Sequence, residues 1–337
     1  MAPTKLNTIA IKLGEIMQKL SDLPISFEFF PPKTDKGAEN LNLTLVDLVK
    51  YEPDFFSVTF GAGGSTRDTT YDAVANIQQN TSVSAAPHIS CIRSTRTEIL
   101  NLLEKYQQLG INYLVALRGD IPQTASNQGE FKYASELISF IRQQTGDHFT
   151  IAVAAYPEIH PEASNAEHDF NHFCNKMNSG ADLAITQYFY NVDAFYRFQD
   201  LYQQRGFTQA LIPGIMPINN LAKLQRFSTG CGAEIPRWIL QTMANYADDA
   251  QSQLEFGLDV VTKLCDDLIC NGVDGLHFYT MNQTTLVANV LDRLGLPRDY
   301  RKISKPSIDS GLNHRINPYC GKADFGQSSL VADIPAA

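Results

Sequence analysis

Apolar and polar positions repeat along the chain with two different periods. Short runs rich in β-branched and aromatic residues, typical of buried strands, are separated by segments whose apolar residues recur every three or four positions. Leu41, Leu45 and Leu48 form one such helical stripe. The strand-like runs lie at 25–30, 55–60, 85–90, 113–118, 151–156, 183–187, 211–216 and 275–280. Eight strands that alternate with helices predict an α/β protein with a parallel (β/α)8 TIM-type barrel.

The connections between these runs predict one catalytic domain. Only the connection 219–271 is long, and we expect it to hold two or more helices. No linker rich in proline, glycine or serine divides the chain before residue 300, so residues 1–300 are expected to form a single barrel domain. Residues 301–337 are polar and aperiodic, and they predict a C-terminal extension that is either disordered or packed on a neighbour. An N-terminal helix is predicted from the apolar stripe Leu13, Ile16, Met17 and Leu20.

Composition narrows the class of partner. The chain of 337 residues is 44% hydrophobic and 19% charged, which is enough apolar material for a large core. Its net charge of −9 argues against a nucleic-acid binder, which needs a basic surface, and against docking on anionic lipid. The sequence contains no apolar run long enough for a transmembrane helix and no pattern of a signal peptide. Its six scattered cysteines contain no C-x-x-C pair, which predicts reduced thiols and a cytoplasmic protein.

Polar residues gather where the predicted strands end. In barrel enzymes the chemistry lies at the carboxyl ends of the strands and in the loops that follow. A single polar residue on a barrel strand is often only a hydrogen-bonded filler, but many on one face favour a site. The candidates are Glu28, Thr59, His88, Arg118, Gly119, Asp120, Tyr156, His160, Gln187, Asn282 and Gln283.

Glu28 is the most informative of these candidates. It lies inside a predicted strand, between Phe27 and Phe29. We expect desolvation to raise the pKa of its carboxyl above the ordinary value of about 4.3. A carboxyl that is neutral near pH 7 can act as a general acid. The alternative is a buried glutamate that pairs with a lysine for purely structural reasons.

A pair of histidines on a predicted helix has the spacing of metal ligands. His168 and His172 are four residues apart, so they share one helix face. The segment between them lacks the glutamate of a zinc protease motif, and no second carboxylate cluster accompanies it. The sequence therefore predicts no metal site.

Eight segments at the strand ends resemble, in order, those of the methylenetetrahydrofolate reductases. They are SFEFFPPK at 26–33, SVTFGA at 57–62, APH at 86–88, ALRGD at 116–120, AYPEIHPEA at 155–163, ITQYF at 185–189, PGIMP at 213–217 and HFYTMN at 277–282. The resemblance extends from about residue 24 to 296 and is to the short bacterial type. It implies an FAD-dependent homo-oligomer that reduces 5,10-methylenetetrahydrofolate to 5-methyltetrahydrofolate. NADH or NADPH would be the electron donor, with ping-pong kinetics.

The resemblance also implies roles for particular residues. Glu28 matches the general acid that protonates a folate nitrogen, and Asp120 matches an aspartate near the flavin and the substrate. Gln187, Leu221 and Gln283 match further substrate-binding positions, which Glu28 and Asp120 share. The positions matching an FAD shell are Thr59, His88, Arg118, Gly119, Asp120, Tyr133, Ala134, Tyr156, His160, Ala163, Asp169, His172, Asn175 and Lys176.

The sequence departs from the family pattern at four of these positions. Gln283 stands where many bacterial members have an arginine, and Leu221 replaces a phenylalanine of a loop that covers bound ligands. Asn175 occupies a position that is often basic, and His172 one that is often asparagine. Because Glu28 and the aspartate partner are retained, these changes concern ligand affinity more than reaction type.

Two other functions stay open at this point. A metal-dependent barrel hydrolase would use His88, His160, His168 and Asp120 as ligands. A non-catalytic flavin- or folate-binding protein would keep the cofactor shell without the acid, and the presence of Glu28 argues against it.

Overall fold

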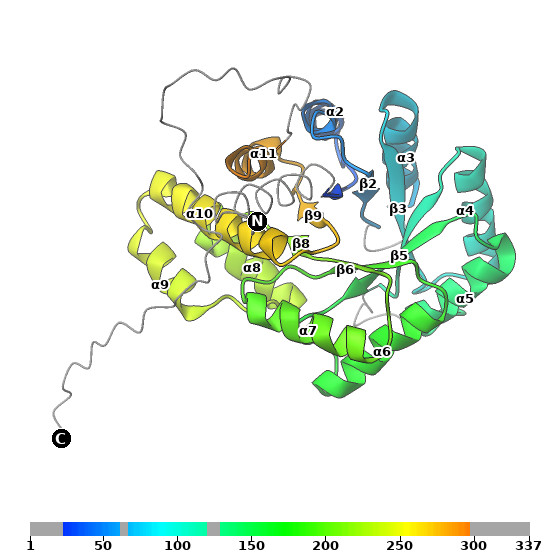
Figure 1. Ribbon diagram of the computed structural model, residues 1–337. Helices are drawn as coiled ribbons and strands as arrows, with labels where there is room; N and C mark the ends of the chain where they lie inside the picture. Colours follow the sequence, from blue (N-terminus) through cyan, green and yellow to red (C-terminus); the bar gives the residue numbers. More distant parts are fainter. Residues whose placement is uncertain (1–22, 61–66, 120–128, 297–337) are drawn as a thin grey trace, which may run out of the picture. The chain divides into compact units, whose positions relative to one another are not determined.

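The computed structural model describes residues 23–60, 67–119 and 129–296. The predicted N-terminal helix, the extension 301–337 and the candidate Asp120 lie outside these described residues. Within them the predicted fold is confirmed: parallel strands form a barrel-like sheet surrounded by helices (Figure 1). In the part of the chain described, the sheet has nine strands in the order β7-β6-β5-β4-β3-β2-β1-β9-β8.

The elements follow one another as alternating strands and helices, as the sequence pattern predicts. The strands are β1 (Ile25–Phe29), β2 (Phe55–Val58), β3 (Ser84–Ser90), β4 (Tyr113–Leu117), β5 (Thr150–Ala155), β6 (Leu183–Thr186), β7 (Ala210–Ile212), β8 (Gly214–Ile215) and β9 (Leu276–Tyr279). The helices are α2 (Asp35–Val49), α3 (Arg67–Asn80), α4 (Arg96–Gln108), α5 (Ala134–Thr145), α6 (Ala166–Asn178), α7 (Val192–Gln204), α8 (Leu221–Cys231), α9 (Arg237–Asn245), α10 (Ala250–Cys270) and α11 (Thr284–Arg293). The long connection 219–271 thus holds α8, α9 and α10, which confirms that prediction.

The seventh predicted strand is divided at Pro213 into β7 and β8. Proline has no backbone N–H to donate, so it interrupts the ladder. β7 pairs with β6, while β8 pairs with β9, so the two halves together close the sheet. A Cβ on Gly214 would lie 2.1 Å from the carbonyl oxygen of Thr186, which explains why glycine follows the proline. The ninth strand is therefore one half of a predicted strand rather than an additional β-α unit.

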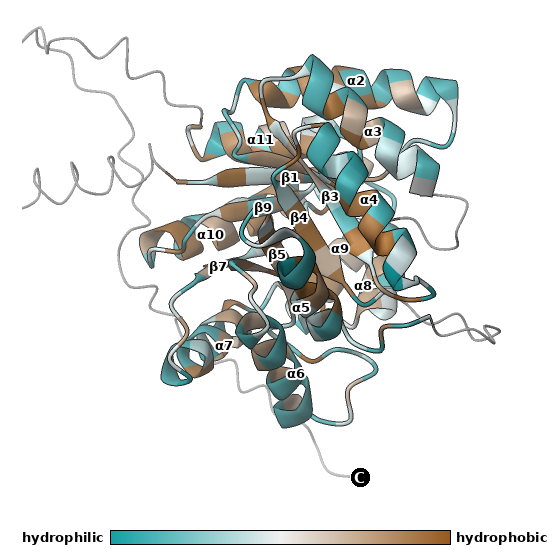
Figure 2. Ribbon diagram, turned by 90° about the vertical axis from the view of Figure 1, so that its right-hand side faces the viewer, coloured by the Kyte–Doolittle hydropathy of each residue, from teal (hydrophilic) through white to brown (hydrophobic). Residues whose placement is uncertain are grey.

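Alternation along β1 separates two environments. Ile25, Phe27 and Phe29 belong to the large core that the strands form with the helices, whereas Ser26 and Glu28 point to the opposite face. That face is the barrel interior, which holds a smaller apolar cluster contributed by successive strands: Phe55, Ala86, Val115, Ala152, Leu183, Ile185 and Ile212. Figure 2 shows hydrophobic residues concentrated on the strands and hydrophilic residues on the outer turns of helices such as α6. Among the described helices, none is both long and apolar enough to cross a membrane.

Helix boundaries are set by local hydrogen bonds that place the loops at the sheet's carboxyl edge. Thr95 and Glu98 form a reciprocal capping box at the start of α4. The Asn165 side chain accepts a hydrogen bond from the His168 N–H at the start of α6, 2.8 Å away. These caps fix where each helix begins, and so they fix the length of the loop between a strand end and its helix.

Candidate active site

Glu28 lies inside the barrel near the carboxyl end of β1, between two histidines from other strands. Its Oε2 is 3.3 Å from Nε2 of His88 on β3 and 3.6 Å from Nε2 of His277 on β9. The His277 ring is fully buried, and its Nδ1 is 2.7 Å from the Ser26 hydroxyl. The pairing of β1 with β9 sets this arrangement, because it places Ser26 opposite His277.

The two imidazoles face the carboxylate at ion-pair distance rather than in hydrogen-bond geometry. Among the described residues, Nε2 of His88 and Nε2 of His277 are buried and have no hydrogen-bond partner, and the same is true of the Ser57 hydroxyl. Ser57 is paired with Glu28 in the register of β1 and β2. Buried polar atoms without hydrogen bonds are costly, so these three atoms have the capacity to bond a further polar group.

The pKa of Glu28 differs from the sequence-based prediction. Burial raises it, as expected, but the charges of His88 and His277 have the larger combined effect and lower the pKa to about 2. The prediction of a raised pKa was wrong because it considered only desolvation, which the two histidines outweigh. The relevant neighbours come from strands distant in sequence.

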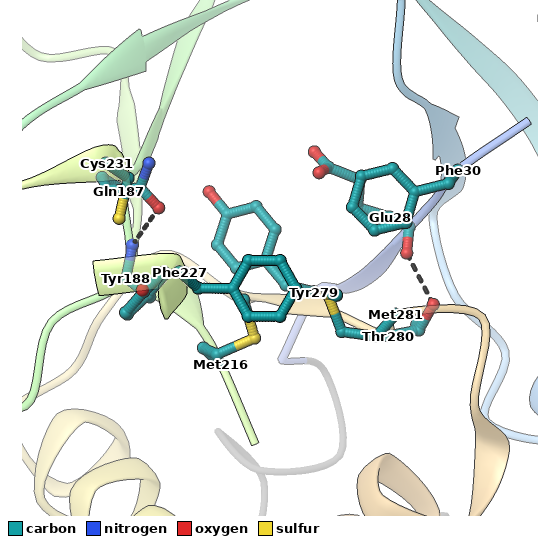
Figure 3. A pocket seen from close by; sticks show the side chains of 10 residues that line it. All are labelled: Glu28, Phe30, Gln187, Tyr188, Met216, Phe227, Cys231, Tyr279, Thr280 and Met281. Carbon is teal, nitrogen blue, oxygen red and sulfur yellow. Dashed lines mark hydrogen bonds between the residues drawn. The ribbon is translucent and has the colours of Figure 1, made fainter. Parts of the chain in front are cut away.

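A pocket opens above Glu28 at the carboxyl end of the barrel. It is lined by Glu28, Phe30, Gln187, Tyr188, Met216, Phe227, Cys231, Tyr279, Thr280 and Met281. Figure 3 shows Glu28 and Gln187 on opposite sides, with the rings of Phe227 and Tyr279 between them in this view. The Tyr279 hydroxyl donates to the carbonyl of Thr186, 2.8 Å away. Aromatic walls around a carboxylate and an amide suit a flat heteroaromatic ligand with polar edges.

The loop after β9 holds the end of β1 in place. Asn282 Nδ2 donates to the carbonyl of Phe30, and Asn282 Oδ1 accepts from the Phe30 N–H, at 2.9 and 2.8 Å. The Thr280 hydroxyl donates to the carbonyl of Glu28, 2.6 Å away. Met281 and Asn282 both have positive φ, near 54°, a strained conformation for residues other than glycine. The side chain of the candidate Asn282 thus holds Phe30, while Thr280 holds the backbone of Glu28.

A second polar cluster lies at the carboxyl ends of β4 and β5. Arg118 Nη2 is 2.5 Å from the Glu162 carboxylate, and the Glu162 N–H donates to Nδ1 of His160 at 3.1 Å. The His160 ring stands edge-on to Tyr156, with ring centroids 4.6 Å apart. Asp169 accepts from the His160 N–H at 2.9 Å, which ties the loop to α6. Contacts between residues from two strands and a helix make this cluster a second polar edge of the barrel mouth.

Residues at the start of α5 and in α6 extend the polar cluster around Arg118 and His160. Tyr133 stacks on His172, with ring centroids 5.0 Å apart. Lys176 donates to the carbonyl of Ala154 at the end of β5. Burial lowers the pKa of Lys176 to about 8, a shift that Asp169 opposes and Arg118 adds to. A half-buried lysine with polar neighbours is typical of a ligand site rather than of a solvated helix face.

The remaining candidates are placed as follows. Thr59 directly follows β2, and Gly119 follows Arg118 with φ +87°, in a space so tight that a Cβ would lie 2.1 Å from the Ser90 hydroxyl. Ala134 is the first residue of α5, Ala163 donates to the carbonyl of His160, and Asn175 is exposed on α6.

Leu221 and Gln283 are not among the residues that line the pocket. Leu221 begins α8 and packs on the core, and Gln283 is exposed at the start of α11. Phe227, further along α8, is the aromatic residue that this helix contributes to the pocket.

Several residues in or beneath the pocket were not identified from the sequence. His277 and Tyr279 lie in a strand-end segment. They could have been found by asking which residues of that strand face the barrel interior, as Glu28 does on its own strand. Phe227 and Cys231 come from α8, far from any strand end. No strand-end rule could have found them.

Comparisons with known proteins decide the family. The family model of methylenetetrahydrofolate reductase matches residues 12–295. A 5,10-methylenetetrahydrofolate reductase of Pectobacterium carotovorum is 36% identical over 287 residues, which cover 85% of this chain and 94% of that protein. The chain belongs to the methylenetetrahydrofolate reductase family.

Other members and one solved structure fit this membership. The 5,10-methylenetetrahydrofolate reductase of Escherichia coli strain K12 is 36% identical over 284 residues, covering 84% of this chain and 94% of that protein. Methylenetetrahydrofolate reductase (NADH) 1 of Zea mays is 35% identical, and the match covers 83% of this chain and 49% of that protein. An uncharacterised Clostridium thermocellum protein that binds 5-methyl-5,6,7,8-tetrahydrofolic acid shares the fold, with a TM-score of 0.59 at 16% identity, covering 84% of this chain and 96% of that one.

The cluster in this family member generates a prediction about acidity. His277→Asn keeps a polar atom near Ser26 but removes the imidazole nitrogen that faces Glu28, while Glu28 stays buried. The pKa of Glu28 should therefore rise from about 2 toward its ordinary value, with His88 still opposing the full rise. Carbon-13 NMR of labelled glutamate carboxyls across a pH titration measures this, with His148→Asn as the control because His148 bonds the Ile111 carbonyl instead.

The sign of the pH effect follows from the lowered pKa. Ionised Glu28 stabilises the fold above the unfolded-state value of about 4.3, and this contribution is lost as pH falls toward 2. In urea unfolding, the free energy of unfolding of His277→Asn should therefore fall less than that of the wild type between about pH 4.3 and 2. An unchanged Glu28 titration in His277→Asn would show that the imidazole does not control the carboxyl.

Proposed function

We propose that this chain reduces 5,10-methylenetetrahydrofolate to 5-methyltetrahydrofolate, using electrons from NADH or NADPH through FAD. The observation that carries the proposal is the cluster of Glu28, His88 and His277 beneath an aromatic pocket, in a member of this family. Folate reduction needs a proton donor beside a site for a flat ring, and the cluster and pocket provide both. The folate ligand of the Clostridium thermocellum protein agrees with this substrate class.

The polar groups at the barrel mouth fit a flavin dinucleotide. His88 Nε2, which faces Glu28 at 3.3 Å, and Ser57 Oγ are buried and make no hydrogen bond within the described segments, so they can bond the polar edge of a flavin ring. Arg118 and Lys176 supply cations for a diphosphate in a chain that is acidic overall. Among the described residues, no side chain caps the start of α5, which leaves N–H groups for an anion or hydroxyl. Bound FAD would supply hydride transfer between the nicotinamide and the folate.

Glu28 would deliver a proton to a ring nitrogen of the folate. Protonation opens the five-membered ring to an iminium cation that can accept hydride. His88 and His277 face the same carboxylate, so the proposed proton donor is a cluster of three side chains rather than an isolated glutamate. Asp120, outside the described residues, is proposed to stabilise the cation by its negative charge.

Gln187 would serve both ligands in turn. Its Oε1 accepts from the Tyr188 N–H at 3.0 Å, which turns the amide along the pocket wall opposite Glu28 in Figure 3. A single pocket that takes nicotinamide and folate alternately gives ping-pong kinetics. The four departures, at Leu221, Gln283, His172 and Asn175, are proposed to alter affinity for folate and FAD. The same proposal includes a cytoplasmic location for the protein and its assembly into a homo-oligomer.

No observation favours the hydrolase. In the described ranges, no group of three histidine, cysteine or carboxylate side chains is arranged to hold a metal ion. His88 faces Glu28, whereas His160 bonds the loop that leads to α6.

Glu28→Gln tests the role of the acid. The amide keeps the shape but carries no transferable proton, so reduction of folate by the reduced enzyme should slow by about 10²–10⁴-fold. Reduction of the enzyme by NADH or NADPH needs no protein acid and should change by less than about tenfold. Anaerobic rapid mixing, followed by flavin absorbance, separates the two halves, with Glu104→Gln on exposed α4 as the control. Near-normal folate reduction would show that Glu28 is not the acid.

Lys176→Ala tests the cofactor shell. Loss of a charged hydrogen bond of about 1.5–3 kcal/mol should weaken FAD retention by about 10- to 100-fold. Since the pKa of Lys176 is about 8, the wild type should also lose FAD more readily as pH rises through that value. Flavin fluorescence after dilution measures both effects, with exposed Lys223→Ala as the matched control. Equal retention in both variants at every pH would remove Lys176 from the shell.

A further inference from the structure

His168 and His172 form a close pair on α6. Their Nε2 atoms are 3.2 Å apart, and their ring centroids are 4.4 Å apart with an interplanar angle of 80°. The His172 ring also stacks on Tyr133, which limits its rotation. The proposed reduction uses neither imidazole as an acid or base. The helix thus presents two converging nitrogens at a surface that solvent can reach.

The separation of the two nitrogens matches the bite of a metal chelate. Zinc–imidazole bonds are about 2.0–2.1 Å long. Two such bonds at angles between 90° and tetrahedral place the nitrogens about 2.9–3.4 Å apart. The observed 3.2 Å lies within this range. The i, i+4 spacing on a helix is the one that places two histidines on one face for metal binding.

In the absence of metal, one proton between the two nitrogens gives an N–H···N hydrogen bond. A metal ion binds the lone pair of an unprotonated imidazole nitrogen, so a metal and a proton compete for the same two atoms.

We propose that His168 and His172 form a two-imidazole site for a transition-metal dication such as Ni²⁺, Cu²⁺ or Zn²⁺. Within the described residues, no third histidine, cysteine or carboxylate completes a metal-binding group, so water fills the other positions. The site is therefore open and weaker than a structural zinc site, and it differs from a protease site because no glutamate lies between the histidines. A bound ion would cross-link two turns of α6 beside Tyr133.

Titration calorimetry with NiCl₂ tests the site. The untagged full chain is titrated at pH 7.5 with and without added FAD, because His172 also lies in the proposed cofactor shell. His168→Ala and His172→Ala should each lower Ni²⁺ affinity by at least about tenfold. His148→Ala should not lower it, since that ring bonds the Ile111 carbonyl. Lowering the pH to 5.5 should weaken binding in the wild type through protonation of the imidazoles.

Two results would overturn the proposal. One is absence of Ni²⁺ binding in both the FAD-loaded and FAD-free protein. The other is binding that both alanine variants retain in full, which would place the metal on other groups such as exposed Cys270. Circular dichroism of α6 variants, together with His168→Asn as a milder change, separates loss of a ligand from loss of the fold. Neither result depends on whether the chain reduces folate.

Discussion

The closure of the parallel sheet is the constraint on which the site depends. Only because β1 pairs with β9 on one side and β2 on the other does Glu28 meet imidazoles from β3 and β9. Alternation along each strand then decides which residues face the interior. Hydrophobic Phe27 and Phe29 stabilise the barrel from outside, and Glu28 between them is exposed to the polar interior.

Closure of the sheet also accounts for the strained backbone after β9 and for the division of one strand into β7 and β8. Pro213 divides one strand, so that β7 binds β6 while β8 binds β9. The loop after β9 adopts positive φ at Met281 and Asn282, and the Asn282 amide then holds the end of β1 from both its oxygen and its nitrogen. Backbone strain beside Glu28 is retained because these hydrogen bonds compensate for it.

Sequence patterns predicted the barrel because strand and helix periods are local properties. Residues such as His88 and Gln187 were found because strand ends meet at one edge of a parallel sheet. The acidity of Glu28 could not be found in this way. Its sequence neighbours are aromatic, but the charges that control its pKa come from His88 and His277, which only the sheet brings near. Phe227 and Cys231 were missed for a similar reason, since α8 folds over the pocket from within a long connection.

The central claim is that the barrel mouth holds FAD and passes electrons from a nicotinamide to a folate. The visible spectrum of the purified protein tests it most directly. We expect flavin absorption bands that bleach when NADH or NADPH is added without oxygen. The bands should return when 5,10-methylenetetrahydrofolate is then added, with 5-methyltetrahydrofolate as the product. A protein that binds no flavin after incubation with FAD, or a reduced flavin that the folate does not reoxidise, would contradict the account.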